Sequence, residues 1–197
     1  MKLIIVRHGE TNENVQRIVQ GQGFGTLSER GKEQAKKLGE RLKKEKIDVI
    51  FCSDLKRARN TAKEIIKFHP KVPVHYTKAL RERSFTVLEG KSGDVYRAAA
   101  EKEGMPRYLY RSPGGENFPD MKARIMPFFE KVCREYNGKK VLFVTHGGVI
   151  KVILGAILGK DWKELQHMDV ANSSVNVIEV KRNHEYEVHL LNCVRHL

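Results

Sequence analysis

Two short apolar runs, far apart in the chain, end in the same way. Leu3–Val6 runs directly into Arg7-His8-Gly9, and Val141–Val144 runs through Thr145 into His146-Gly147-Gly148. A continuous apolar run of this length predicts a strand that is buried on both faces, as in a parallel sheet covered by helices. The carboxyl ends of such strands lie at one edge of the sheet, where α/β folds bind their ligands. If the two strands are neighbours, both histidines therefore face one pocket.

Helical and strand patterns alternate along the rest of the chain. In the first half, the sequence predicts a helix over 28–46 capped by Ser28, a strand over 47–52, a helix from 53 that ends before Pro70, and a short strand over 74–76. In the second half, it predicts a helix over 117–136, a strand over 140–145 and a helix that follows 146–148. The chain then forms a predicted hairpin of 174–180 and 187–194 around a charged turn at 181–185. This alternation is typical of an α/β protein, and we expect a three-layer α/β/α fold with a mostly parallel central sheet.

The length of the chain bounds its domain organisation. A chain of 197 residues can bury one sizeable core, and we expect a single domain over residues 1–197. The segment 83–112 has no sheet periodicity and only a short helical stretch, at 96–102. We expect this segment to form a cap-like insertion over the carboxyl edge of the sheet.

The formal charge of +13 predicts an electrostatic potential that attracts anions. The lysines and arginines are spread over helical faces, as at Lys36 and Lys37, and form no stripe interleaved with aromatic residues. We therefore expect small phosphorylated substrates as partners and no nucleic acid. The three cysteines have no CxxC spacing, no run reaches membrane length, and the N-terminal apolar run is too short for a signal peptide. We expect a cytoplasmic location and no membrane partner, and the oligomeric state stays open.

The residues around the two His-Gly pairs suit phosphoryl transfer. This chemistry needs fixed positive donors and an aligned nucleophile, because negative charge is spread over the phosphoryl oxygens in the transition state. Arg7 and Arg57 supply forked guanidinium donors, and Arg57 follows the predicted strand at 47–52, so that it reaches the same sheet edge. A neutral His8 is then a candidate nucleophile. The amides that follow His146, with a helix N-terminus behind Gly147, also suit an anion.

Glu82 lies between Arg81 and Arg83, a setting in which a carboxylate is ordinarily solvated and without a catalytic role. Its functional interpretation is a general acid that protonates the leaving oxygen. That role requires a carboxyl proton near neutral pH, which burial and an approaching phosphate would favour. We carry Glu82 forward as the candidate acid.

Arg7-His8-Gly9-Glu10-Thr11 resembles the signature of the histidine phosphatase superfamily, also called the phosphoglycerate mutase-like family. The resemblance continues, nearly to the end of the chain, through Asn14, Gly21, Leu27-Ser28, Gly31, Gln34-Ala35, Ser53, Arg57-Ala58, Thr61-Ala62, Leu80, Glu82, Glu89-Gly90, Pro113-Gly114-Gly115-Glu116 and Val144-Thr145-His146-Gly147-Gly148. It implies that His8 becomes phosphorylated, that Arg7, Arg57 and His146 bind the phosphoryl oxygens, and that Glu82 protonates the leaving group. It also implies a place for Asn14 in the phosphate pocket.

The same resemblance bears on the reaction. It implies that mutases carry a long insertion after the acid, which encloses the substrate. Here only residues 83–112 separate Glu82 from Pro113, and this short segment favours hydrolysis. The stretches 80–91 and 121–129 look most similar to the fructose-2,6-bisphosphatase branch that includes TIGAR. Two departures concern substrate choice. Thr86 follows Phe85 where the family usually has glycine, and Phe24-Gly25-Thr26 replaces an acidic residue that often precedes Leu27.

The sequence thus leads to the hypothesis of a metal-independent phosphoric monoester hydrolase that works through a phosphohistidine intermediate. The expected substrates are small phosphate monoesters, such as fructose 2,6-bisphosphate or another sugar or glycerate phosphate. The remaining histidines have no metal-site spacing, so we expect neither metal nor cofactor. One alternative is a cofactor-dependent phosphoglycerate mutase. Another is a catalytically retired basic binding module, which the intact set of His8, Arg7, Arg57, Glu82 and His146 disfavours.

Overall fold

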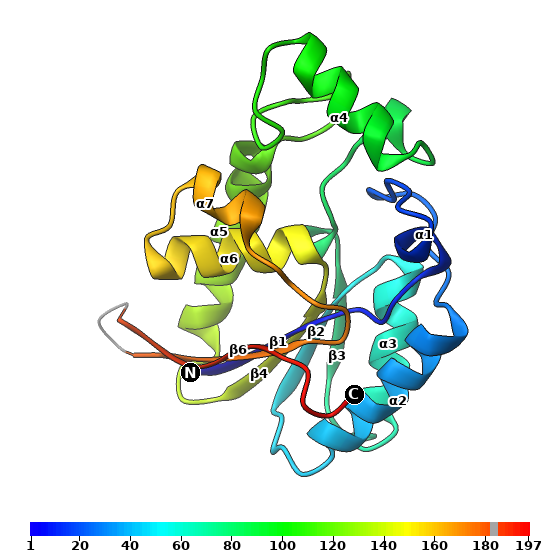
Figure 1. Ribbon diagram of the computed structural model, residues 1–197. Helices are drawn as coiled ribbons and strands as arrows, with labels where there is room; N and C mark the ends of the chain where they lie inside the picture. Colours follow the sequence, from blue (N-terminus) through cyan, green and yellow to red (C-terminus); the bar gives the residue numbers. More distant parts are fainter. Residues whose placement is uncertain (182–184) are drawn as a thin grey trace.

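Six strands form one mixed sheet in the computed structural model, which describes residues 1–181 and 185–197 (Figure 1). The strands are β1 (Lys2–Arg7), β2 (Val49–Ser53), β3 (Val74–Thr77), β4 (Lys140–Thr145), β5 (Val175–Val180) and β6 (Tyr186–Cys193), in the order β3-β2-β4-β1-β5-β6. The first four run parallel to one another, and β5 and β6 are antiparallel additions beside β1. Because β1 pairs directly with β4, the two His-Gly pairs emerge side by side, so the condition that the sequence left open is met.

Helices cover both faces of this sheet, which explains why its central strands are apolar throughout. Alternate side chains of a strand point to opposite faces. Ile4 and Val6 of β1 pack with α2 (Glu29–Leu42) and α3 (Lys56–Ile66) in one core. Leu3 and Ile5 pack with α5 (Phe118–Glu135) and α6 (Gly147–Leu158) in the other. The predicted three-layer α/β/α fold is confirmed (Figure 1).

Several predicted boundaries were wrong by a few residues. Helix α2 ends at Leu42 instead of residue 46, because the chain turns there and the Glu45 amide donates to the Leu42 carbonyl. Strand β2 begins at Val49, and α3 begins at Lys56 instead of residue 53. The elements that the sequence did not predict are α1 (Asn12–Val15), α7 (Trp162–His167) and the 3₁₀ turns η1 (Lys78–Leu80) and η2 (Thr86–Leu88), all too short to show a periodic pattern. Residues 182–184 of the turn predicted at 181–185 lie outside the described residues.

The segment 83–112 lies beyond the carboxyl ends of the parallel strands and carries η2 and α4 (Gly93–Lys102) (Figure 1). It has a small apolar cluster of its own, in which Leu88, Ala100 and Tyr110 are buried. Arg83 is 4% exposed and ties the segment together, because its guanidinium donates to the Arg107, Tyr110 and Glu116 carbonyls and to the Tyr96 hydroxyl. Among the helices of the described residues, none has both the length and the apolarity needed to cross a bilayer.

Candidate active site

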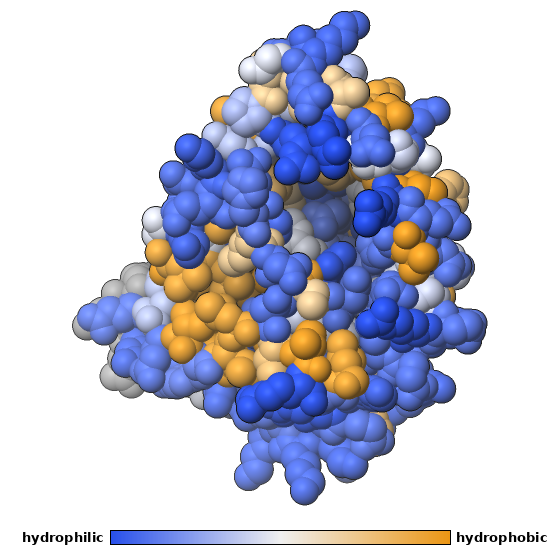
Figure 2. Space-filling model, viewed as in Figure 1, coloured by the Kyte–Doolittle hydropathy of each residue, from blue (hydrophilic) through white to orange (hydrophobic). Residues whose placement is uncertain are grey.

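A cavity of about 410 Å³ opens at the carboxyl ends of β1 and β4, beneath the 83–112 segment. Figure 2 shows it as a hollow with hydrophilic residues along its rim. Of the seven site residues predicted from the sequence, six line it, namely Arg7, His8, Asn14, Arg57, Glu82 and Gly147. The seventh, His146, is fully buried beside His8, with the two ring centroids 5.2 Å apart. The fold therefore brings the whole predicted set together.

His8 directly follows β1 and is 3% exposed. Its Nδ1 lies 2.7 Å from the Gly9 carbonyl oxygen. A carbonyl can only accept a hydrogen bond, so Nδ1 carries the proton and Nε2 keeps its lone pair. Burial holds the pKa of His8 well below its ordinary value, and the nearby Arg57 and Arg7 act in the same direction. At neutral pH the ring is therefore uncharged, as nucleophilic attack requires.

His146 precedes α6 and points across the end of β2. Its Nε2 lies 2.8 Å from the Ser53 hydroxyl, and its Nδ1 is buried with no hydrogen-bond partner among the described residues. Burial again holds the pKa of this ring well below its ordinary value, followed in importance by Arg57 and His8. Two neutral imidazoles thus lie side by side at the base of the cavity.

The two site arginines are held by backbone carbonyls. Arg57, in the first turn of α3, donates from Nη2 to Gly21 at 2.6 Å and from Nη1 to Gly23, and Arg7 donates to Val170. The Nε atoms of Arg7 and Arg57 are buried and have no partner within the described part of the chain. Burial lowers the pKa of Arg57 to about 10, so that this guanidinium stays charged at neutral pH.

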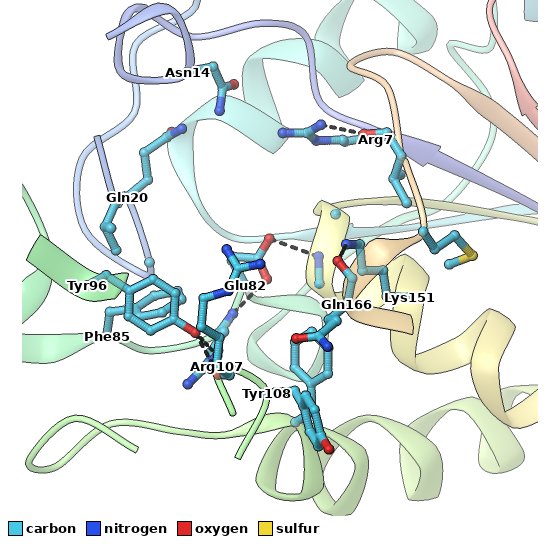
Figure 3. A pocket seen from close by; sticks show the side chains of 18 of the residues that line it. Arg7, Asn14, Gln20, Glu82, Phe85, Tyr96, Arg107, Tyr108, Lys151 and Gln166 are labelled. Carbon is cyan, nitrogen blue, oxygen red and sulfur yellow. Dashed lines mark hydrogen bonds between the residues drawn. The ribbon is translucent and has the colours of Figure 1, made fainter. Parts of the chain in front are cut away.

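Glu82 follows η1 and reaches into the cavity between α6 and the 83–112 segment (Figure 3). Its Oε2 accepts from the Gly148 amide at 3.0 Å, and its Oε1 accepts from the Arg83 amide at 2.8 Å. A Cβ on Gly148 would lie 2.2 Å from Glu82 Oε1, so the second glycine of the His-Gly-Gly sequence makes room for this carboxyl group.

Asn14 and Gly147 complete the predicted set. The Asn14 side-chain oxygen accepts from the Thr11 amide at 3.1 Å and from Asn172 at 3.3 Å, which leaves its amide nitrogen facing the cavity (Figure 3). Gly147 is the first residue of α6 and packs against the Arg7 guanidinium. An amide at this helix N-terminus is well placed to bind an anion.

Sequence reasoning missed two groups of residues around the site. The first supports Glu82: Arg124 of α5 pairs with both oxygens of Glu116, at 2.7 and 2.8 Å, and donates to the backbone carbonyls of Ala79 and Arg81. The second is on the cavity wall and includes Lys151, which lies one helical turn after Gly147 in α6. The four-residue spacing on one helix was the available signal for Lys151, whereas the contacts of Arg124 join segments too distant in sequence to be seen.

The described residues bring three possible metal ligands together at one place. Glu179, Glu187 and His189 meet on β5 and β6, where all three are exposed. None of them lines the cavity.

Comparison with known proteins agrees with this geometry. The family described as "Histidine phosphatase superfamily (branch 1)" matches residues 3–194. A metal-independent phosphoserine phosphatase of Arabidopsis thaliana is 35% identical over 91% of this chain and 76% of its own length. Fructose-2,6-bisphosphatase TIGAR of Bos taurus is 40% identical over 67% of this chain and 50% of its own. The solved structure of Bacillus stearothermophilus YhfR superimposes with a TM-score of 0.90 at 30% identity, covering 99% of this chain and 98% of that one.

The match to the family therefore extends over almost all of the chain and over its whole fold. The two phosphatases are named for different substrates, and another relative, of Salmonella choleraesuis, is named a probable phosphoglycerate mutase, so the comparisons leave the substrate open. The protein belongs to the histidine phosphatase superfamily, as its sequence motifs predicted, within branch 1 of that family, and is a phosphoric monoester hydrolase.

Proposed function

We propose that the protein hydrolyses small phosphate monoesters, without a metal ion, by passing the phosphoryl group through His8. One observation carries this proposal. Three buried nitrogen atoms, Arg7 Nε, Arg57 Nε and His146 Nδ1, have no partner within the described residues, and all belong to side chains that surround the neutral His8 ring. Buried polar groups are rarely left without partners. An anion bound in front of His8 would supply a partner for all three.

In the first step, His8 Nε2 attacks phosphorus, an N–P bond forms, and the ester P–O bond breaks. Arg7, Arg57 and His146 hold the phosphoryl oxygens, and Asn14 and the Gly147 amide add further donors. Such fixed donors stabilise the charge that develops in the transition state. Glu82 gives its proton to the leaving oxygen, so that the product departs as an alcohol.

In the second step, water attacks the phosphohistidine. The Glu82 carboxylate takes the proton of this water, the N–P bond breaks, and inorganic phosphate leaves with His8 restored as a neutral ring. Each oxygen of Glu82 accepts one backbone N–H, at 2.8 and 3.0 Å, and retains a second lone pair for the exchanged proton. The same carboxyl group can therefore act as acid and then as base.

The substrate class that we propose is small sugar phosphates and glycerate phosphates, fructose 2,6-bisphosphate among them. The size of the cavity, about 410 Å³, suits a compound of this kind and not a folded phosphoprotein. Relatives named as a phosphoserine phosphatase and a fructose-2,6-bisphosphatase support the same range.

Release of inorganic phosphate from a panel of sugar phosphates, glycerate phosphates, phosphoserine and phosphoproteins, in the presence of a chelator, tests the proposal. We expect release by the wild type and none by His8→Ala, and acid quenching with labelled substrate should trap the label on His8. Full activity of His8→Ala would refute the phosphohistidine step. Loss of wild-type activity in chelator would refute metal independence, and phosphate that moves to another carbon of the product instead of into solution would indicate a mutase.

A further inference from the structure

The partly buried lysines and arginines fall into two groups, which differ in whether a carboxylate pairs with them. Among the described residues, the lysines and arginines that are at least partly buried are Arg7, Arg57, Arg81, Arg83, Arg124, Lys140 and Lys151. Arg81, Arg124 and Lys140 lie outside the cavity, and each has a carboxylate partner at 2.6 to 2.7 Å, namely Asp54, Glu116 and Glu45. The other four line the cavity, and none of them has a carboxylate within 4.0 Å in the described part of the chain.

Three of these four cavity cations already have a use. Arg7 and Arg57 flank His8, and Arg83 directs its donors to the carbonyl groups and the tyrosine hydroxyl that hold the 83–112 segment. Lys151 has none of these uses. Because burying an unpaired charge is costly, a lysine kept in this position without a carboxylate calls for a partner that arrives from outside the protein.

The position of Lys151 is fixed by two neighbouring helices. It belongs to α6, four residues after Gly147, which places it about 6 Å further along the helix axis. Its Nζ donates to the Gln166 carbonyl of α7 at 3.0 Å, and the side chain extends toward the same open space as Glu82 and Arg7 (Figure 3). An ammonium group has three donors, so two remain for a ligand.

We propose that Lys151 binds a second anionic group of the substrate, a carboxylate or a second phosphate, and that the enzyme therefore prefers small phosphate esters that carry one. This inference rests on the proposed function and narrows its substrate class. The second group lies about one helical turn from the phosphoryl group, a separation that suits esters in which few bonds join the two acids. Arg107, which also lines the cavity from the 83–112 segment, adds positive charge on the facing side.

The charges around Lys151 are consistent with this role. Burial lowers the pKa of Lys151, Glu82 opposes that effect, and Arg7, Asp169 and Arg107 contribute smaller effects of both signs. No single carboxylate of the described residues neutralises the ammonium group. A substrate anion placed at Lys151 would supply the missing opposite charge.

Matched substrate pairs test the proposal. Phosphoserine is compared with phosphoethanolamine, which lacks only the carboxylate, and fructose 1,6-bisphosphate is compared with fructose 1-phosphate, which lacks only the second phosphate. We expect the wild type to show the higher kcat/KM for the member with two acids in at least one pair. The pair that shows this preference identifies which anion Lys151 recognises.

The variant Lys151→Met should lower kcat/KM for the substrate with two acids about tenfold more than for its partner. A tenfold change corresponds to about 1.4 kcal/mol, which is close to the free energy that a hydrogen bond to a charged group contributes. Lys151→Arg should keep much of the preference. Lys163→Met on α7, which is exposed and outside the cavity, is the matched control and should behave as the wild type. Equal loss for both members of each pair, or a wild type with no preference in either pair, would overturn the proposal.

Binding separates this inference from the proposed function. Calorimetric titration of the same compounds into His8→Ala, alone and combined with Lys151→Met, measures the subsite without turnover. Tighter binding of the two-acid compound that disappears with Lys151→Met supports the subsite even if the wild type released no phosphate. Equal affinity for the compounds with and without the second acid would refute the subsite, even if hydrolysis is confirmed.

Discussion

Thr86 has a backbone conformation that branched residues seldom adopt, with φ at +44°. The family resemblance of the sequence implies glycine here, and threonine at this position places local strain in the fold. The Thr86 hydroxyl donates to the Pro113 carbonyl at 2.6 Å and lies 3.3 Å from the Ser112 hydroxyl, which joins η2 to the end of the 83–112 segment. This hydrogen bond offsets part of the strain.

Replacing Thr86 by valine should therefore destabilise the protein more than replacing it by glycine. Thr86→Val keeps the branched side chain at positive φ and loses the hydrogen bond, at a cost of about 1–2 kcal/mol. Thr86→Gly loses the same hydrogen bond but also relieves strain of about 1–2 kcal/mol, so it should be close to neutral. Urea unfolding of the three proteins measures the difference. A valine variant as stable as the wild type would show that the hydroxyl contributes nothing.

His8 and His146 should make the stability of the protein depend on pH. Burial holds the pKa of both rings well below the ordinary value of 6.5, whereas in the unfolded chain they titrate near that value. Below about pH 6.5 the unfolded state binds protons that the folded state does not, so the free energy of unfolding falls as the pH drops, by up to about 1.4 kcal/mol per pH unit for each ring. His8→Gln should remove about half of this dependence between pH 6.5 and 5, and His167→Gln, at an exposed position, should leave it unchanged. The same slope in all three proteins would contradict the assignment.

Among the elements, α5 has a role that its amphipathic pattern did not reveal. The pattern identified the apolar face of the helix, which packs on the sheet through Ile125 and Phe129. Arg124, beside that face, donates to the Lys78–Leu80 turn and to the strand-like segment that follows it, while pairing with Glu116. Glu116 in turn accepts from the Ser84 amide at 3.0 Å. The segment that carries Glu82 is therefore held on both sides by one ion pair.

Glu116→Gln should reduce kcat about ten- to a hundredfold with little change in KM, since small displacements of a catalytic group have effects of this size. The substrate would still meet Arg7, Arg57 and His8, but Glu82 would lose its fixed position. Glu130→Gln, a substitution at an exposed position of α5, the helix that carries Arg124, is the control. Steady-state kinetics of both variants give kcat and KM separately. A change in KM alone would place Glu116 in substrate binding instead.

At the scale of the whole molecule, the sequence predicted what depends on local pattern. The apolar run Leu3–Val6 lies within one strand and packs on both faces of the sheet, so the layers could be predicted from it. The two His-Gly pairs directly follow their strands, so the core of the site could be predicted as well. Lys151 could have been found from its spacing to Gly147 on one helix, whereas the partners of Arg124 in the Lys78–Leu80 turn lie more than 40 residues away in the chain, and nothing near Arg124 in the sequence marks them. Long-range contacts such as Arg124 to Ala79 exist only once the chain has folded, and α1 and α7 are too short to produce a periodic signal.

The net charge of +13 also acts at this scale, because its field extends well beyond the cations that line the cavity. Salt screens such fields over about 10 Å at 0.1 M ionic strength, so kcat/KM should fall as salt is added, mainly through KM. A bisphosphate carries more charge than p-nitrophenyl phosphate and should show the steeper fall. Rates for both substrates, measured from about 0.05 to 0.5 M salt, a range over which the screening length shortens severalfold, give the two slopes. Equal slopes would mean that the field guides all phosphates alike and that discrimination arises only from contacts inside the cavity.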